Sequence, residues 1–411
     1  MRLLTITPEY PPAPCYSVGR YAYELNRALA RQPNVEAHIL CWHADGQPEH
    51  RQVDGVMTHR VDCTVPAHAP DETGSVVVKN VPLAGKACEI LRGYGPFDFV
   101  CAHDWPGILA GRAAAFAFGV PVILFLHHTK VAECANRLTR DQLYVAEVEA
   151  WAGEGVRAVV APSLAAQEDV AGTYRIPRRK ITAIPCGVAR ESFTPREEWA
   201  DFRSVLAEQD QAIVLFVGRL SAAKGVDVLI EAMSSVIEKH PEARLVFAGD
   251  GVLRPDLTRR TSELGVSTLF TGHIEGRALA AAYQCADMVV LPARYEPTGM
   301  AALEAMTCGK PLVVSDVGAF RELVAEGAGL RVPAGQPKPL ADAISRILNE
   351  PETARGLGAA AMERSTAFTW DAAAERLLAL ANRLLGRATG GKSGIAWRKS
   401  GDAERGGGVG G

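Results

Sequence analysis

The stretch ADMVVLPARYEPTGMAALEAMTCGKPLVVSDV, residues 286–317, decides the fold. Its two apolar runs, residues 288–292 and 311–314, are typical of buried strands, and strong helix formers lie between them at residues 300–306. Alternation of strands and helices continues through the chain in both directions. This alternation predicts an α/β protein whose parallel sheets are flanked by helices.

Two glutamates, Glu296 and Glu304, lie just before and inside this predicted helix. A carboxylate among apolar strands needs a specific partner, because burial disfavours a charge. Glu296 lies in the loop at the carboxyl end of a strand, where open α/β sheets bind ligands. The N–H groups of Thr298, Gly299 and Met300 begin the helix and suit an anion. A simpler alternative is that Glu304 only stabilises the helix dipole.

Length and composition limit the class of protein. The 411 residues suffice for two domains, and 48% apolar with 22% charged residues is typical of a globular protein. A net charge of −3 argues against a nucleic-acid binder with a basic surface. Nine cysteines without a C-x-x-C pair favour free thiols in the cytoplasm. No apolar run is long enough to span a membrane, and peripheral contact at its inner face stays open.

A second motif, GRLSAAKG at residues 218–225, follows an apolar strand and precedes a helix. Arg219 and Lys224 would place two cations beside a helix N-terminus. This combination suits a diphosphate, whose charge must be stabilised when a bond to it breaks. A solvated basic loop is the simpler alternative.

Polar side chains also follow strands in the first half of the chain. The apolar run at residues 121–126 ends at His127 and His128, in a position suited to catalysis. A second strand ends at His103 and Asp104. These two residues could take part in the site, or they could equally form a structural pair that caps the following helix.

Residues 296–311 resemble the signature E-P-x-G-x-x-x-L-E-A-M-x-x-G-x-P of retaining GT-B glycosyltransferases, in particular the large family 4. Thr298 stands where that family usually carries Phe. GRLSAAKG matches the family's G-R-L-x-x-x-K-G motif. The resemblance implies a GT-B fold, in which two Rossmann-like domains with parallel sheets face each other and a C-terminal helix crosses back to the first domain.

The expected organisation follows from this resemblance and from the composition of the last residues. The tail is rich in Gly, Ser, Lys and Arg and has no apolar face. The expected parts are a first, acceptor-side domain (1–188), a linker (189–210), a nucleotide-sugar-binding domain (211–369), the crossing helix (370–385) and a disordered tail (386–411).

The resemblance also implies an activity, the transfer of a hexose from a nucleoside-diphosphate sugar to a hydroxyl acceptor with retained anomeric configuration. The acceptor stays open among carbohydrates, lipid-linked sugars and small molecules. The implied catalytic residues are His127 and Glu296, with His128 as the alternative to His127. The residues implied to bind the donor are Arg219, Lys224, Thr298, Gly299, Met300, Glu304, Gly19, Gly251 and His273.

One departure concerns the loop after the first strand, PPAPCYSVG at residues 11–19. The family commonly has P-P-x-x-x-G-G-x-G there, so Tyr16 and Ser17 replace two glycines and Gly19 remains. Glycine lets a backbone approach a ligand closely. Side chains at these positions could narrow the acceptor site, change the choice of acceptor, or impair the enzyme.

No His, Cys and Asp cluster has metal-ligand spacing, and no D-x-D motif is found, so we expect transfer without a metal ion or other cofactor. Two other functions remain open. One is a nucleotide-sugar epimerase of the same architecture. The other is a catalytically silent nucleotide-sugar-binding protein, which the residues Tyr16 and Ser17 motivate.

Overall fold

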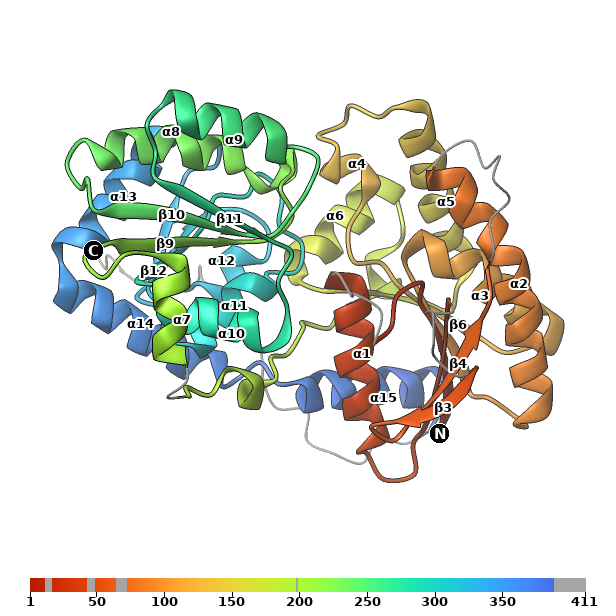
Figure 1. Ribbon diagram of the computed structural model, residues 1–411. Helices are drawn as coiled ribbons and strands as arrows, with labels where there is room; N and C mark the ends of the chain where they lie inside the picture. Colours follow the sequence, from red (N-terminus) through yellow and green to blue (C-terminus); the bar gives the residue numbers. More distant parts are fainter. Residues whose placement is uncertain (12–16, 43–48, 64–71, 197–198, 388–411) are drawn as a thin grey trace, which may run out of the picture.

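The computed structural model describes residues 1–11, 17–42, 49–63, 72–196 and 199–387. These residues form two α/β domains that lie side by side, each with one sheet flanked by helices (Figure 1). The predicted fold class is therefore confirmed. Tyr16 and most of the expected tail lie outside the described residues.

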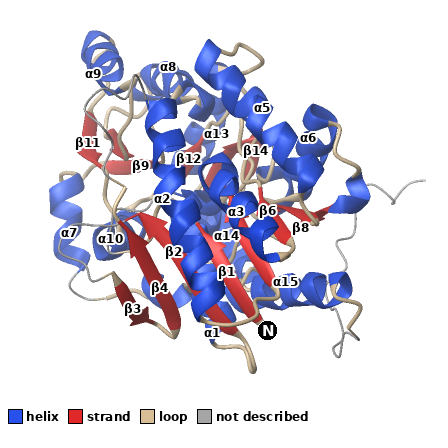
Figure 2. Cartoon of the chain, turned by 90° about the vertical axis from the view of Figure 1, so that its right-hand side faces the viewer, coloured by secondary structure: helices blue, strands red, loops and turns tan. Residues whose placement is uncertain are grey.

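The first domain contains an eight-stranded sheet in the order β3-β4-β2-β1-β5-β6-β7-β8 (Figure 2). Every pairing is parallel except that of β3 with β4. This edge hairpin turns at Asp54 and Gly55, whose φ angles of 50° and 82° fit a tight hairpin turn. The strands are β1 (Arg2–Ile6), β2 (Glu36–Trp42), β3 (His50–Val53), β4 (Val56–Val61), β5 (Phe99–His103), β6 (Val122–Phe125), β7 (Ala158–Ala161) and β8 (Ile181–Ala183).

The second domain contains a six-stranded, wholly parallel sheet in the order β11-β10-β9-β12-β13-β14. The two strands of residues 286–317, β12 and β13, are neighbours in this sheet and are fully buried. The strands are β9 (Ala212–Val217), β10 (Ala243–Ala248), β11 (Thr268–Gly272), β12 (Met288–Leu291), β13 (Leu312–Ser315) and β14 (Leu330–Val332).

Helices connect the strands and cover the sheets. In the first domain they are α1 (Ser17–Ala30), α2 (Glu72–Gly93), α3 (Asp104–Phe118), α4 (Lys130–Glu133), α5 (Arg140–Gly155) and α6 (Leu164–Tyr174). Those that follow are α7 (Trp199–Leu206), α8 (Val226–Ile237), α9 (Arg254–Glu263), α10 (Gly276–Cys285), α11 (Met300–Thr307), α12 (Phe320–Leu323), α13 (Pro337–Asn349), α14 (Pro351–Ser365) and α15 (Trp370–Leu384). No helix among the described residues is long and apolar enough to cross a membrane.

The connection between the domains, residues 189–210, holds a short 3-10 helix (Arg190–Phe193) and α7. Buried Phe193 packs edge-on against Tyr283 of α10, with ring centroids 5.9 Å apart. The thiol of Cys285 donates to the carbonyl of Trp199 over 3.2 Å. The connection is therefore packed against the second domain.

The last helix, α15, returns to the first domain and lies against α1 (Figure 1). Trp370 is buried at its start and meets Tyr21 of α1 edge-on, at a centroid distance of 5.1 Å. Gly187 lies beneath the same turn, and a Cβ at this position would come within 2.2 Å of the Trp370 nitrogen. The crossing helix thus requires a residue without a side chain at the end of the first domain.

A row of hydrogen-bonded polar groups crosses the edge of the first sheet. His38 Nε2 lies 2.8 Å from Glu36 Oε1, and His38 Nδ1 lies 2.9 Å from His59 Nε2. His59 Nδ1 in turn lies 3.0 Å from His50 Nδ1. Burial lowers the pKa of His38 and lowers that of His59 to about 3. The inner two rings are therefore neutral at physiological pH.

This row predicts a loss of stability in acid. An unfolded histidine has a pKa of about 6.5, so between that value and about 3 the unfolded chain binds more protons at His59 than the native protein does. Stability must then fall as the pH falls through this window. His59→Gln should remove about 1 kcal/mol of the decrease between about pH 6 and pH 5. Urea unfolding at each pH measures it.

The matched control is His273→Gln, which replaces a partly exposed histidine of the second domain. It controls for the loss of one histidine ring outside the row. A pH dependence for His59→Gln identical to that of wild type would contradict the assignment.

Glu149 has the opposite effect on the pH dependence. Burial raises its pKa to about 7, so its contribution to the free energy of unfolding is lost as the pH rises.

Candidate functional site

The loops after β6 and β12, at the carboxyl ends of their sheets, meet between the domains. Thr129, which follows β6, donates its N–H to the hydroxyl of Tyr295, which follows β12, over 3.1 Å. We call this zone the seam. Its cross-domain contacts join Arg20, Thr129 and Glu133 of the first domain to Glu304, Tyr295 and Arg219 of the second.

Glu296 lies in the seam in the turn before α11, with 9% of its surface exposed. Its Oε2 lies 2.7 Å from Lys224 Nζ, and its Oε1 accepts from the N–H groups of Gly299 (2.8 Å) and Thr298 (3.3 Å). Burial alone would raise the pKa of Glu296, but Lys224 and the two N–H groups lower it below its usual value. The structure thus brings Lys224, Thr298 and Gly299, all predicted site residues, together around the carboxylate of a fourth, Glu296.

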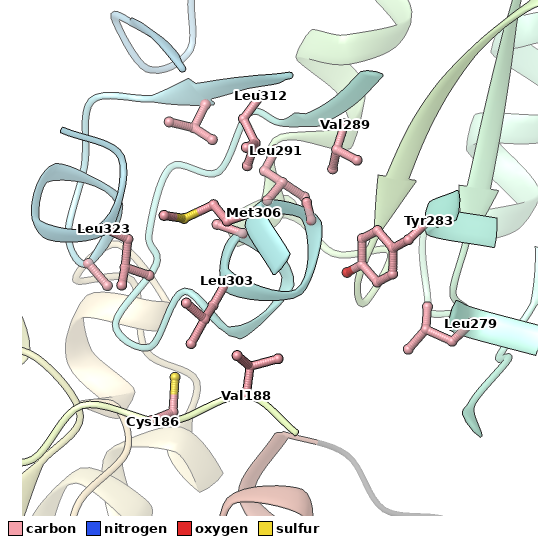
Figure 3. Close-up of a cluster of buried hydrophobic side chains, with 14 of the residues drawn as sticks. Cys186, Val188, Leu279, Tyr283, Val289, Leu291, Leu303, Met306, Leu312 and Leu323 are labelled. Carbon is pink, nitrogen blue, oxygen red and sulfur yellow. The ribbon is translucent and has the colours of Figure 1, made fainter. Parts of the chain in front are cut away.

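The start of α11 depends on glycine at position 299. Gly299 has a φ of 77°, in the left-handed region, and a Cβ there would come within 2.4 Å of Leu323 Cδ1. Met300 is the first residue of α11. The rest of the helix is fixed by packing, with Leu303 and Met306 among buried side chains such as Leu291 (Figure 3).

Glu304 lies on α11 with 4% of its surface exposed and has partners from both domains. Its Oε1 lies 2.8 Å from Arg20 Nη1 of α1, and its Oε2 accepts from the hydroxyl of Tyr283 over 2.8 Å. The Glu304 charge raises the pKa of Arg20. A carboxylate offers about four acceptor positions, so these two bonds leave capacity for further donors.

His127 is turned into the first domain. Its Nε2 lies 2.9 Å from His103 Nδ1, and its ring meets that of Tyr21 edge-on at 4.7 Å. Burial lowers the pKa of His127 well below the usual range and lowers that of His103 to about 3. Both rings are therefore neutral, and the ring nitrogen of one donates an N–H hydrogen bond to the other. His127 has only 5% of its surface exposed.

His128 lies on the seam side of the same loop. Its Nε2 lies 3.5 Å from Glu133 Oε2, and its Nδ1 lies 3.8 Å from Asp104 Oδ2. Burial lowers the pKa of His128 to about 4, and Lys130 adds to that decrease while Glu133 opposes it. The two adjacent histidines thus lie in different surroundings, one among rings and one among charges.

Asp104 fixes the backbone of this histidine pair. It has a φ of 49°, which is uncommon for a residue other than glycine, and it begins α3. Its Oδ1 accepts from the N–H of His127 over 2.7 Å. Burial raises the pKa of Asp104, and the hydrogen bond from His127 opposes that increase. His103 and Asp104, left open by the sequence, therefore both contact the predicted histidine.

Glu133 is a site residue that the sequence analysis missed. Its Oε1 lies 2.6 Å from Arg219 Nη2, and its Oε2 lies 2.5 Å from Lys130 Nζ. Burial would raise the pKa of Glu133, but His128, Lys130 and Arg219 lower it to about 2. The acid belongs to the four-residue helix α4, and no motif in the sequence marks it.

The remaining predicted donor residues lie around these pairs. Gly251, after β10, lies close to the loop of residues 218–225. A Cβ at position 251 would come within 2.5 Å of the Leu220 carbonyl oxygen. His273 follows β11 and lies 3.7 Å from Glu275. Gly19 is buried in the first turn of α1, where a Cβ would come within 2.6 Å of Glu9 Cβ. Its lack of a side chain therefore has a packing reason.

Two further features lie outside this constellation. The described residues include no group of three or more His, Cys, Asp or Glu side chains arranged to hold a metal ion. A hollow of about 600 Å³ lies between α2 and the end of β4, away from the seam. Its lining consists of Glu49, Arg60, Val61, Asp62, Pro82, Gly85, Lys86 and Glu89.

Both halves of the chain match known protein families. Residues 18–192 match the family described as Glycosyltransferase Family 4, and residues 197–364 match Glycosyl transferases group 1. A D-inositol 3-phosphate glycosyltransferase of Actinosynnema mirum is 31% identical over 324 residues, which cover 72% of this chain and 77% of that protein. A glycogen synthase of Mycobacterium tuberculosis is 29% identical over 399 residues, 91% of this chain and 92% of that protein.

Among solved structures, the sucrose-phosphate synthase of Thermosynechococcus elongatus superposes with a TM-score of 0.79 at 25% identity. The superposition covers 94% of this chain and 99% of that one. Both halves of the chain thus match glycosyltransferase families, and the whole chain matches one of their folds. The chain therefore belongs to the GT-B glycosyltransferases described by Glycosyl transferases group 1 and Glycosyltransferase Family 4.

Proposed function

We propose that this glycosyltransferase moves a hexose from a nucleoside-diphosphate sugar to an acceptor hydroxyl and retains the anomeric configuration. The observation that carries the proposal is the seam itself. In the seam Lys224 pairs with Glu296 in the turn before α11, Arg219 pairs with Glu133, and Glu304 of α11 pairs with Arg20. Cations and backbone N–H groups stabilise the charge that develops on a leaving diphosphate.

The diphosphate would bind to Arg219, Lys224 and the N–H groups at Thr298, Gly299 and Met300. Lys224 and two of these N–H groups already hold the Glu296 carboxylate, which supports their role as an anion site. Because cations supply the positive charge here, we further propose that transfer needs no metal ion. Activity should then be the same with and without EDTA.

The nucleoside would lie along the second domain. Glu304 has acceptor positions left for the ribose hydroxyls beside its bonds to Arg20 and Tyr283. Gly251 and His273 would lie near the base, because the loop after β10 abuts the Arg219 loop at Leu220. Gly19, next to Arg20 in α1, would lie on the facing side.

Glu296 and His127 would contact the transferred sugar, Glu296 from the second domain and His127 from the first. Glu296 is ionised and therefore an acceptor for sugar hydroxyls. His127 is neutral, so either of its ring nitrogens can carry the proton. His128, whose ring nitrogens lie 3.5 Å from Glu133 Oε2 and 3.8 Å from Asp104 Oδ2, is the alternative for the first-domain role.

We place this chemistry in the reducing cytoplasm. The eight cysteines among the described residues are all free. Cys186 lies beside the site, with its Sγ 3.8 Å from the carbonyl of Thr298. Burial raises the pKa of Cys186 to about 12, so the thiol stays protonated and does not act as a nucleophile.

The donor site is tested by nucleotide binding. UDP, GDP and ADP, and their glucose and mannose conjugates, should differ in the thermal stabilisation they give, with about 2.7 kcal/mol at a hundredfold excess over Kd for the preferred base. Lys224→Ala and Glu304→Ala should each raise the Kd by about tenfold or more, since each removes a charge-assisted contact. Isothermal titration calorimetry measures the affinities.

The matched control is Lys338→Ala, which removes an exposed lysine paired with Asp342 on α13. Its nucleotide affinity should equal that of wild type. Wild-type affinity in both Lys224→Ala and Glu304→Ala would show that the donor binds elsewhere. Formation of product from donor alone, without acceptor, would instead favour an epimerase.

His127→Ala should lower kcat by about a hundredfold while the Kd for nucleoside diphosphate stays near that of wild type, because the ring would contact the sugar and not the nucleotide. Steady-state transfer rates with a panel of hydroxyl acceptors measure this. His128→Ala is the parallel variant. A large loss of kcat in His128→Ala with little loss in His127→Ala would move the role to His128.

A further inference from the structure

The side chain of Tyr295 makes hydrogen bonds from the second domain to the first. Its hydroxyl donates to Asp169 Oδ2 over 2.8 Å and accepts from the N–H of Thr129 over 3.1 Å. The hydroxyl of Thr129 donates to the same Asp169 oxygen over 2.8 Å. Burial and the Asp169 charge raise the pKa of Tyr295, so the phenol stays protonated and remains a donor. We call these three residues the triad.

Two more contacts dock the start of α6 on the same part of the second domain. The hydroxyl of Ser163 donates to the carbonyl of Pro297 over 2.7 Å. Glu322 of α12 accepts from the N–H groups of Leu164 (3.0 Å) and Ala165 (2.7 Å). A second-domain acid thus satisfies free N–H groups at the N-terminus of a first-domain helix.

These contacts surround the proposed site residues in sequence. Tyr295 and Pro297 flank Glu296, so the turn that carries this acid is tied to the first domain on both sides. Thr129 directly follows His128 in the loop after β6. Separation of the domains must therefore break the triad and release the Glu296 turn from that loop at the same time.

We propose that the triad of Tyr295, Asp169 and Thr129 is a closure latch, and that Tyr295 acts through it as a positioning residue that sets Glu296 against the loop after β6. This inference rests on the proposed function. Groups from two domains reach a reactive geometry only when closure fixes their distance, and small misplacements slow a reaction strongly. The nucleotide contacts come mostly from the second domain and do not need the latch.

The test begins with Tyr295→Phe, which removes the hydroxyl and keeps the ring. The expected result is a fall in kcat of about tenfold, because a hydrogen bond to a charged group is lost. The Kd for UDP, or for whichever of UDP, GDP and ADP binds best, should change by less than about twofold. Small-angle X-ray scattering should show a larger radius of gyration, because the separated form gains population.

The matched control is Tyr23→Phe. Tyr23 donates to Asp54 over 2.7 Å, so this variant also loses a tyrosine–aspartate hydrogen bond, but one that lies within the first domain. It should leave kcat, nucleotide affinity and the radius of gyration unchanged. Asp169→Asn should lower kcat like Tyr295→Phe, and the double variant should lose little more than the worse single variant, because both changes remove one contact.

Each outcome decides the proposal. An unchanged radius of gyration or an unchanged kcat in Tyr295→Phe, with wild type active, overturns the latch. A loss of kcat accompanied by an equal loss of nucleotide affinity, or by additive losses in the double variant, also overturns it in favour of general destabilisation. A wild type that neither binds nucleotide nor transfers sugar overturns the proposed function and the positioning role together, and scattering then still decides whether Tyr295 closes the domains.

Discussion

The negative charge of Glu304 is the constraint on which the arrangement of the two domains depends. The residue is almost completely buried on a helix between two apolar strands, and an unpaired carboxylate in such a place costs several kcal/mol. Tyr283 supplies one hydrogen bond from within the second domain, but the compensating charge comes from Arg20 of the first. The acid thereby fixes α1 against the second domain, and α15 holds α1 from another side.

The same pairing of charges is repeated along the seam, with Arg219 beside Glu133, Lys224 beside Glu296 and Arg20 beside Glu304. The first and last of these pairs cross between the domains. In the proposed reaction, a diphosphate that binds one of these cations displaces its carboxylate. The cation stays paired, but the displaced acid must find another donor or water, because an unpaired buried charge is costly. Displacement of Glu133 from Arg219 would also break a contact between the domains.

Central strands such as β12 and β13 could be predicted because their side chains are buried and form continuous apolar runs. An edge strand and a helix show where this pattern fails. The edge strand β3 reads HRQV, and three of its four residues are exposed, so it lacks an apolar pattern. Helix α2 contains Pro82 and a run of β-branched residues from Val76 to Val78, which argue locally against a helix. Its burial against the sheet, through residues such as Leu83 and Ile90, outweighs that local preference.

The site could be predicted only as far as its motifs reach. Arg219 and Glu296 lie in loops at strand ends that any parallel sheet brings to one edge, and Lys224 and Glu304 lie in the helical segments that follow those loops. Their partners could not be predicted, since Glu133 and Arg20 meet them across the two domains and no spacing in the sequence encodes that contact.

The two histidines after β6 are another case in which the sequence does not determine the contacts of a side chain. Their spacing places both at the end of a strand, but the side to which each ring turns depends on backbone dihedral angles. Asp104 sets those angles, because its carboxylate accepts the N–H of His127. It does so from a left-handed conformation that costs about 1 kcal/mol or more for a residue other than glycine. A strain of this size persists only where surrounding contacts fix it, and here those contacts hold one ring against His103 while the other faces Glu133.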